Sequence, residues 1–332
     1  MHRFSLREKA TRACAWPDNL PQRLNAGLLT PFPPHDRYVG QLTDMLLRTT
    51  PVPVNLKGIA LGDVCMGTEV LCGPYQRGPW FELLFAAGQG CISLPTFRAI
   101  ITTCPIEILE QGPISSAPAA CQAAVAAAGI ECPGNAYFAY NYLDQCPPAV
   151  FRGGDEPAPG NDVSGYPCGG DQALKAWIEL PAVKAALNVA PNAVFESFDN
   201  GAGFVYNLTW PSNLPLMRRL QTGADGVRTL VYQGETDPSI SSVKAQNWTF
   251  AMNFPLKEAW RPWTFPNSTV VAGQVVQWEG DFTLATIRGS GHMVPTYKPY
   301  SAYLMLQNFL SDGGWPAIPP SGQSRKEKPY QI

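Results

Sequence analysis

Residues 283–295 read Thr-Leu-Ala-Thr-Ile-Arg-Gly-Ser-Gly-His-Met-Val-Pro and include the only histidine of the chain beyond position 35. The first five residues are apolar or β-branched, which is typical of a short buried strand. The glycine and serine residues that follow turn the chain sharply. We therefore expect His292 at the tip of a loop, just past the end of a strand.

A second strand with a loop of the same kind lies upstream. Residues 228–233 read Arg-Thr-Leu-Val-Tyr-Gln and precede Gly-Glu-Thr-Asp-Pro, in which Pro238 disfavours helical geometry at Asp237. Asp237 is thus also expected at a strand end, 292 − 237 = 55 positions before His292. Taken alone, a lone histidine and an Asp-Pro pair are commonly structural. Together, an acid and then a histidine on two strand-end loops are typical of an α/β-hydrolase triad.

These two loops resemble signatures of the serine carboxypeptidase family. Its members carry Gly-Asp-x-Asp where residues 234–237 read Gly-Glu-Thr-Asp, and Gly-Ala-Gly-His-Met-Val-Pro where residues 289–295 read Gly-Ser-Gly-His-Met-Val-Pro. Segments similar to the family also occur, in the family's order, at residues 54–63, 180–189 and 260–263. The resemblance covers about residues 37–312.

The resemblance implies a fold and a set of roles. The fold class is α/β: an α/β-hydrolase fold, N-terminally incomplete, with a disulfide-rich helical cap insertion. Asp237 and His292 are then the catalytic acid and base, and Met293 lines the substrate pocket with the cap. The activity implied is that of a serine-type carboxypeptidase, which releases C-terminal amino acids from peptides through an acyl-enzyme. The substrate would be a peptide or protein C-terminus.

The nucleophile of that family has no counterpart here. Family members place Gly-Glu-Ser-Tyr-Ala-Gly just before a segment similar to Arg37-Tyr38-Val39, where this chain has Pro-Phe-Pro-Pro-His-Asp. A nucleophile elbow needs glycines because its turn is too tight for side chains. The upstream Trp-Asn-Gly-Gly-Pro-Gly segment is missing as well. We therefore expect an inactive chain, equivalent to a family member without its N-terminal third through truncation or an incorrect gene start.

Three alternatives remain open at this point. The chain is a non-catalytic pseudoenzyme or binding protein, an acyltransferase of the same family, or a non-functional fragment whose exposed strand at residues 56–61 leads to aggregation. Peptide hydrolysis, acyl-ester transfer and the oligomeric state in solution separate these alternatives.

Composition limits the partners. The formal net charge is −2 and the isoelectric point is about 6.0, so the sequence gives no reason to expect nucleic acid or an anionic membrane as a partner. No apolar run is long enough to span a bilayer. We expect no cofactor and no metal, and the oligomeric state is not readable.

The cysteines favour disulfides. Cys14 stands alone, eight cysteines lie from Cys65 to Cys168, and none follows. The cluster lacks paired C-x-x-C spacings and nearby histidines, which argues against zinc, and its even count in a loop-rich segment suits an oxidising compartment. Eight cysteines allow 105 pairings, so the connectivity stays open.

Glycosylation signals indicate the same compartment. Asn207, Asn247 and Asn267 each begin an Asn-x-Ser/Thr sequence. With the cysteines and the resemblance, they predict a secreted or vacuolar/lysosomal protein. The first twenty residues nevertheless contain no apolar segment typical of a signal peptide.

The chain divides into five predicted parts. Residues 1–36 are an unrelated or disordered leader, and residues 37–64 hold the first helix and strand of the hydrolase core. Residues 65–180 are the cysteine-rich cap insertion. Residues 181–316 hold the C-terminal part of the core, and residues 317–332 are a disordered tail.

Apolar spacing and turn residues predict individual elements. Helices are expected near residues 38–46, 95–103, 119–128, 181–189 and 241–252, and a strand at residues 55–61. Residues 269–278 predict a hairpin that turns at Ala272 and Gly273. A helix at residues 300–310 is expected to close the core through Tyr303, Leu306 and Leu310.

Overall fold

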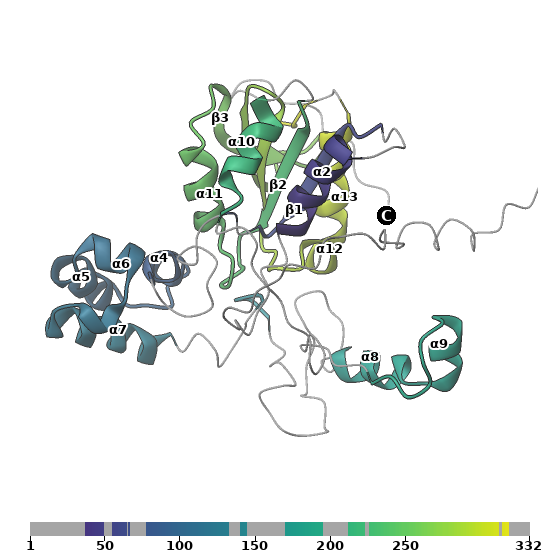
Figure 1. The fold of residues 1–332 in the computed structure, drawn as a ribbon. Coiled ribbons are helices and arrows are strands. Elements are labelled where there is room, and N and C mark those ends of the chain that lie inside the picture. The colour runs from purple at the N-terminus through teal and green to yellow at the C-terminus, as the bar shows by residue number, and fades with distance from the viewer. Residues whose placement is uncertain are drawn as a thin grey trace, which may run out of the picture.

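The computed structural model describes residues 37–49, 55–64, 66, 78–132, 140–144, 170–194, 212–222, 226–311 and 314–318. The elements in these residues are helices and strands (Figure 1). In chain order they are α2 (Arg37–Thr49), β1 (Gly58–Gly62), α4 (Trp80–Gly88), α5 (Leu94–Thr103), α6 (Ile106–Gln111), the 3₁₀ helix η1 (Ile114–Ser116), α7 (Ala119–Glu131), α8 (Gly170–Ile178), α9 (Pro181–Ala186), α10 (Leu214–Thr222), β2 (Arg228–Gly234), α11 (Ser242–Ala251), β3 (Leu256–Thr264), β4 (Val271–Trp278), β5 (Phe282–Ile287), α12 (Val294–Tyr297) and α13 (Pro299–Leu310).

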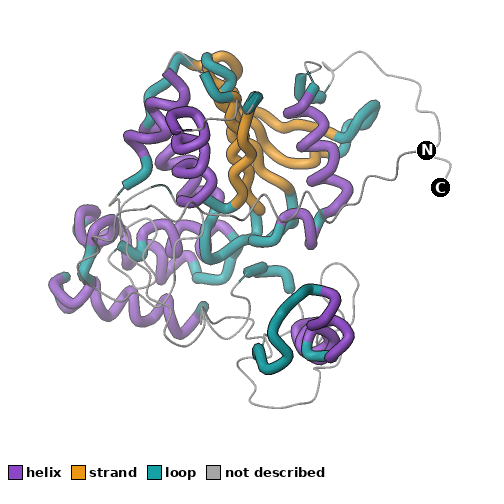
Figure 2. The backbone as a smooth tube through the Cα atoms, turned by 45° about the vertical axis from the view of Figure 1, so that its right-hand side comes forward, coloured by secondary structure: helices purple, strands orange, loops and turns teal. Residues whose placement is uncertain are grey.

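The five strands form one mixed sheet in the order β1-β2-β5-β4-β3. Strands β1, β2 and β5 run parallel, and β5, β4 and β3 are antiparallel neighbours. Figure 2 shows the sheet between helices on its two sides. The α/β fold class predicted from the sequence is therefore confirmed.

Strand β5 lies in the middle of the sheet, and all six of its residues are buried. Phe282 and Leu284 belong to the apolar cluster on one face, and Ala285 and Ile287 to the cluster on the other. A strand that is covered on both faces reads as a continuous apolar or β-branched run rather than an alternating one. This explains why residues 283–287 predict a buried strand correctly.

Helices α10 and α11 pack on one face of the sheet, and α13 packs on the other. Leu216 and Met217 of α10 and Trp248 of α11 join the first apolar cluster. Helix α2 lies beside α10, where Asp44 accepts from Arg219 at 2.5 Å. Burial of these side chains is the main driving force for assembling the sheet and its helices.

The predicted hairpin at residues 269–278 is wrong, because β4 runs without a break from Val271 to Trp278. The connection to β3 lies at residues 265–270 instead. Gly273 is needed for close packing rather than for a turn: a Cβ at this position would lie 1.8 Å from the Thr286 carbonyl oxygen and 2.8 Å from Trp263 Nε1. A glycine inside a strand can thus mark a close backbone approach.

Helix α13 forms as predicted, but through a different face. Tyr303 and Leu310 are 56% and 68% exposed, whereas Ala302, Met305 and Phe309 are buried against the sheet. The helix carries apolar residues on two stripes, so its spacing alone did not identify the stripe that meets the sheet. The face that α13 buries is set by its packing on the sheet, because Phe309 lies in the same apolar cluster as Leu230 of β2.

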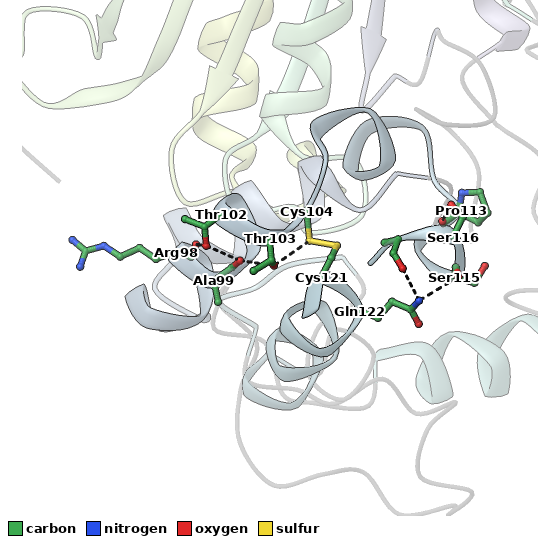
Figure 3. Close-up of a disulfide and its surroundings, with 11 residues drawn as sticks. Arg98, Ala99, Thr102, Thr103, Cys104, Pro113, Ser115, Ser116, Cys121 and Gln122 are labelled. Atoms are coloured by element: carbon green, nitrogen blue, oxygen red, sulfur yellow. Dashed lines mark hydrogen bonds between the residues drawn. A yellow bond between two sulfur atoms is a disulfide. The ribbon is translucent and has the colours of Figure 1, made fainter. Parts of the chain in front are cut away.

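Helices α4, α5, α6 and α7 form a small unit beside the sheet (Figure 1). Their shared core is formed by the buried residues Leu83, Ile92, Ile100, Leu109, Ala124 and Ala128. Two disulfides close it: Cys91 pairs with Cys132, and Cys104 pairs with Cys121. Figure 3 shows the second disulfide between the end of α5 and the start of α7. These pairings resolve part of the connectivity that the sequence left open.

Helices α8 and α9 lie apart from the sheet in both views (Figures 1 and 2). They contact each other, and Lys184 forms an ion pair with Glu179 between them. The domain boundaries predicted at residues 64/65 and 180/181 stay predictions, and the leader and residues 319–332 of the tail lie outside the described residues. No helix in the described part of the chain has the length and apolar character needed to cross a bilayer.

Candidate active site

Three neighbouring parallel strands end at the same edge of the sheet, and each is followed by an ionisable side chain. Asp63 follows β1, Asp237 lies in the loop after β2, and His292 lies in the loop after β5. One ligand-type atom from each residue lies within 4.8 Å of those from the other two. The parallel register therefore gathers residues that are up to 229 positions apart, 292 − 63, at one point.

The Asp237 carboxylate is fully buried and held by several donors. Its Oδ1 accepts from the backbone amides of Ser239 at 2.8 Å and Ile240 at 3.2 Å. Its Oδ2 lies 2.8 Å from His292 Nδ1 and 3.5 Å from Gln233 Nε2. Donors on both oxygens fix the orientation of the carboxylate.

His292 is brought to Asp237 by a close approach of the two loops. Glu235 N donates to Ile287 O at 3.1 Å, and Thr236 N donates to Ser290 O at 2.8 Å. A Cβ on Gly234 would lie 2.2 Å from the Gly291 carbonyl oxygen. Glycine at position 234 is therefore required for the contact between the acid loop and the histidine loop.

A short segment at residues 140–144 supports both loops. Tyr140 O accepts from His292 N at 2.6 Å, and Tyr142 N donates to Thr236 O at 2.7 Å. The Asn141 carboxamide oxygen accepts from Thr236 Oγ1 at 2.7 Å. Gly291 is needed here too, because a Cβ would lie 2.2 Å from Tyr140 O. The sequence analysis did not single out this segment, and its residues carry no motif that would have identified it.

Asp63 is the second functional candidate that the sequence analysis missed. It is 6% exposed, it has a positive φ of 51°, and its Oδ1 accepts from Gln233 Nε2 at 2.9 Å. Its backbone amide donates to Tyr232 O at 3.0 Å. An aspartate just after a predicted strand was the available signal. The position of Asp63 beside Asp237 follows only from the pairing of β1 with β2.

Two further ionisable groups near the site have shifted pKa values. Burial raises the pKa of the Glu235 carboxyl, while the hydrogen bond from Thr286 and the charge of Arg288 act in the opposite direction. Burial also raises the pKa of the Tyr232 hydroxyl, and the negative charge of Asp63 adds to this shift. Both shifts arise mainly from burial of the side chain, which disfavours its charged form.

Ser290 is the hydroxyl nearest to His292 along the chain. It is fully buried, and its Oγ donates to the Gly291 carbonyl oxygen at 3.2 Å. A buried hydroxyl that donates a hydrogen bond to the backbone of its own loop is not accessible to a substrate. Ser290 therefore supports the histidine loop rather than serving as the nucleophile.

The remaining predicted site residues lie as follows. Met293 is 43% exposed next to His292. Asn247 is exposed on α11, and Asn267 is exposed in the turn between β3 and β4. Asn207 lies outside the described residues. The substrate-binding and glycosylation roles of these residues stay predictions.

Comparisons with known proteins agree on one family. The serine carboxypeptidase family profile matches residues 37–312. Serine carboxypeptidase-like 40 of Arabidopsis thaliana is 26% identical over 280 residues, which are 83% of this chain and 52% of that protein. Serine carboxypeptidase 1 of Hordeum vulgare is 26% identical over 176 residues, which are 49% of this chain and 32% of that protein. The chain thus spans about one third to one half of these relatives.

A solved structure has the same fold. The crystal structure of Kex1(delta)p, a prohormone-processing carboxypeptidase from Saccharomyces cerevisiae, matches with a TM-score of 0.59 at 13% identity. The match covers 85% of this chain and 63% of that one. At this identity the likeness concerns the fold alone.

Proposed function

The chain belongs to the serine carboxypeptidase family, and from this premise we propose that Asp237 and His292 are the acid and the base of its acyl-transfer site. The observation that carries the proposal is the 2.8 Å separation between Asp237 Oδ2 and His292 Nδ1 at the ends of neighbouring parallel strands. An imidazole oriented by a buried carboxylate is the base that activates a hydroxyl in such sites.

In this proposal the two ring nitrogens have different tasks. Nδ1 of His292 donates to the buried Asp237 carboxylate, which fixes the tautomer and stabilises the imidazolium when it forms. Nε2 is then the nitrogen that takes the proton from a serine hydroxyl as it attacks the last peptide carbonyl. The same nitrogen returns the proton to the leaving amino acid. The substrate class proposed is a peptide or protein with a free C-terminus, with Met293 on the rim of its pocket.

We infer that these 332 residues do not catalyse peptide hydrolysis on their own. The six residues before Arg37 contain no serine, and the engaged Ser290 does not replace it. In triad hydrolases, removing any one member leaves only about 10³- to 10⁴-fold catalysis, which comes from the oxyanion hole and substrate binding. The proposal is thus that the chain carries the acid–base half of the site.

A peptide assay tests the inference on activity. The purified chain is incubated with an N-blocked peptide that has a free C-terminus, and release of the last amino acid is followed by mass spectrometry. We expect no release above that of the H292Q variant. Release that a serine-directed phosphonate abolishes would overturn the inference, because it requires a reactive serine. Transfer of the acyl group to an added alcohol would instead identify an acyltransferase.

Proton NMR tests the acid–base pair without any turnover. The chain has three histidines, and the H2Q/H35Q background leaves His292 as the only one. We expect one strongly downfield Nδ1 proton that disappears in H292Q and shifts upfield in D237N. As a matched control, D281N changes an exposed aspartate that is 3.9 Å from Lys257 and should leave the resonance unchanged. Absence of the downfield proton in a folded sample would contradict the proposed pair.

We also propose that the chain passes through the secretory pathway and carries N-linked glycans. Two disulfides and the exposure of Asn247 and Asn267 support this proposal. Protein secreted from a eukaryotic host should lose mass on treatment with a glycan-removing amidase. The N247Q and N267Q variants should each lose part of that difference, and identical masses in all variants would contradict glycosylation at these residues.

A further inference from the structure

We propose that Asp63 is a positioning residue that acts through His292: its buried carboxylate stabilises the imidazolium form of the ring together with Asp237. The inference rests on the proposed acyl-transfer role and adds a second acid to it. In a catalytic triad, one carboxylate orients the imidazole and stabilises the imidazolium that forms when the ring takes a proton. Here another carboxylate lies at the end of the neighbouring strand β1.

Asp63 lies close enough to the imidazole to act on its charge. An Asp63 oxygen lies within 4.8 Å of a His292 ring nitrogen and of an Asp237 oxygen. An opposite charge within about 4–6 Å favours the charged form of an ionisable group. Asp63 is 6% exposed, so water screens its charge little. Burial raises the pKa of the Tyr232 hydroxyl, and the charge of Asp63 adds to that rise, so this charge acts on more than one neighbour.

A buried glutamine holds the two carboxylates in a fixed relation. Gln233 Nε2 donates to Asp63 Oδ1 at 2.9 Å, lies 3.5 Å from Asp237 Oδ2 and also donates to the Ile240 carbonyl oxygen. The backbone of Asp63 is fixed as well, because its amide donates to Tyr232 O at 3.0 Å. The Asp63 side chain is therefore held beside the acid–base pair rather than turned to solvent.

The other ionisable side chains around the two loops largely offset one another. Among the described residues they are Tyr140, Asp144, Glu235, Lys244, Arg288 and Lys298. Glu235 and Arg288 carry opposite charges that act on each other, and Lys244 forms an ion pair with Glu82. Asp144 and Lys298 also have opposite charges, and a tyrosine is neutral in the range where histidine titrates. The two buried aspartates therefore dominate the charge that the imidazole experiences.

The test is a pH titration of the His292 ring resonances by NMR in the H2Q/H35Q chain. The D63N variant removes the charge, whereas asparagine tolerates the positive φ at position 63 and its oxygen can still accept from Gln233. We expect D63N to lower the titration midpoint of the ring by about one pH unit, which is a tenfold weaker affinity for the proton. A purely structural role of Asp63 would change the stability of the chain and leave this midpoint unchanged. Equal midpoints in D63N and in the unmutated background would therefore overturn the proposal.

Two further variants complete the test. Asp281 also has a positive φ, of 58°, but it is exposed and precedes β5 at the opposite end from His292, so D281N should leave the midpoint unchanged. D237N leaves Asp63 as the remaining carboxylate, and its midpoint should stay above the ordinary histidine value of about 6.5. Should D63N fail to fold, a D237N midpoint at or below that value would overturn the proposal. If D237N lowers the midpoint and D63N does not, only the role of Asp63 is rejected and the acid–base pair stands.

Discussion

The sheet and the unit of α4–α7 are stabilised in different ways. The sheet buries large apolar side chains on both faces, including Trp248, Trp263 and Phe282. The α4–α7 unit has a core of fewer buried residues, which are aliphatic, and is closed by two disulfides. A core of few apolar side chains supplies little stabilisation. The disulfides add to it by restricting the unfolded chain. The candidate site belongs to the sheet, where its geometry rests on hydrogen-bonded strand ends.

The largest expected effect comes from the sheet core. Phe282 is fully buried and packs its ring against Trp248, Phe254 and Trp278. We expect F282A to lower the free energy of unfolding by about 3–5 kcal/mol, measured by urea denaturation. The control F250A removes a ring that also contacts Trp278 but is 46% exposed, and should cost less than about 1 kcal/mol. Equal losses of unfolding free energy in F282A and F250A would contradict the conclusion that burial of large side chains stabilises the sheet.

Opening one disulfide should destabilise the α4–α7 unit and leave the sheet intact. The Cys104–Cys121 bond closes a 17-residue separation, so the C104A/C121A variant should lose about 3 kcal/mol of local stability. The Cys91–Cys132 bond spans 41 residues, and loop-closure entropy makes its loss about 0.8 kcal/mol larger. Amide hydrogen exchange measures both. Faster exchange in β2 and β5 would show that the two regions are not independent.

The contact between the two regions should have a smaller effect. Lys244 of α11 is 6% exposed and donates to Glu82 of α4 at 2.5 Å and to Ser239 O at 2.9 Å. The K244M variant loses both hydrogen bonds and should be less stable by about 1–2 kcal/mol. E82Q removes only the charge of a half-exposed partner and should cost less than about 1 kcal/mol. A larger loss for E82Q than for K244M would contradict this ranking of the two contacts.

The smallest effect is a pH dependence within the α4–α7 unit. Hydrogen bonds from Thr96 and from the backbone amide of Ser93 lower the pKa of the Glu131 carboxyl, which ties the end of α7 to the start of α5. A lowered folded-state pKa stabilises the contact above the ordinary glutamate value of about 4.3, and the contact is lost as the pH falls below it. Protection of the amides in the first turn of α5, measured relative to their intrinsic exchange rates, should therefore fall below pH 4. E131Q should make that protection independent of pH in the same range.

Local patterns predicted much of the sheet and the proximity of Asp237 and His292. Residues 228–233 and 283–287 predicted β2 and β5 because buried parallel strands require continuous apolar or β-branched runs. Pro238 and the glycines around His292 then placed both side chains at strand ends. Local patterns gave wrong predictions where the sequence fitted two structures equally well. Gly273 predicted a turn but permits a close strand approach, and α13 offered two apolar stripes.

By itself, the sequence predicted the strands at residues 55–61, 228–233 and 283–287 and the loops that follow them, because these features depend on neighbours a few positions apart. The tertiary structure alone decided that Asp63 and Gln233 join Asp237 and His292, that residues 140–144 support both loops, and that Cys91 pairs with Cys132. Those relations depend on the order of parallel strands and on helix packing. Both are set by long-range burial and not by any local pattern.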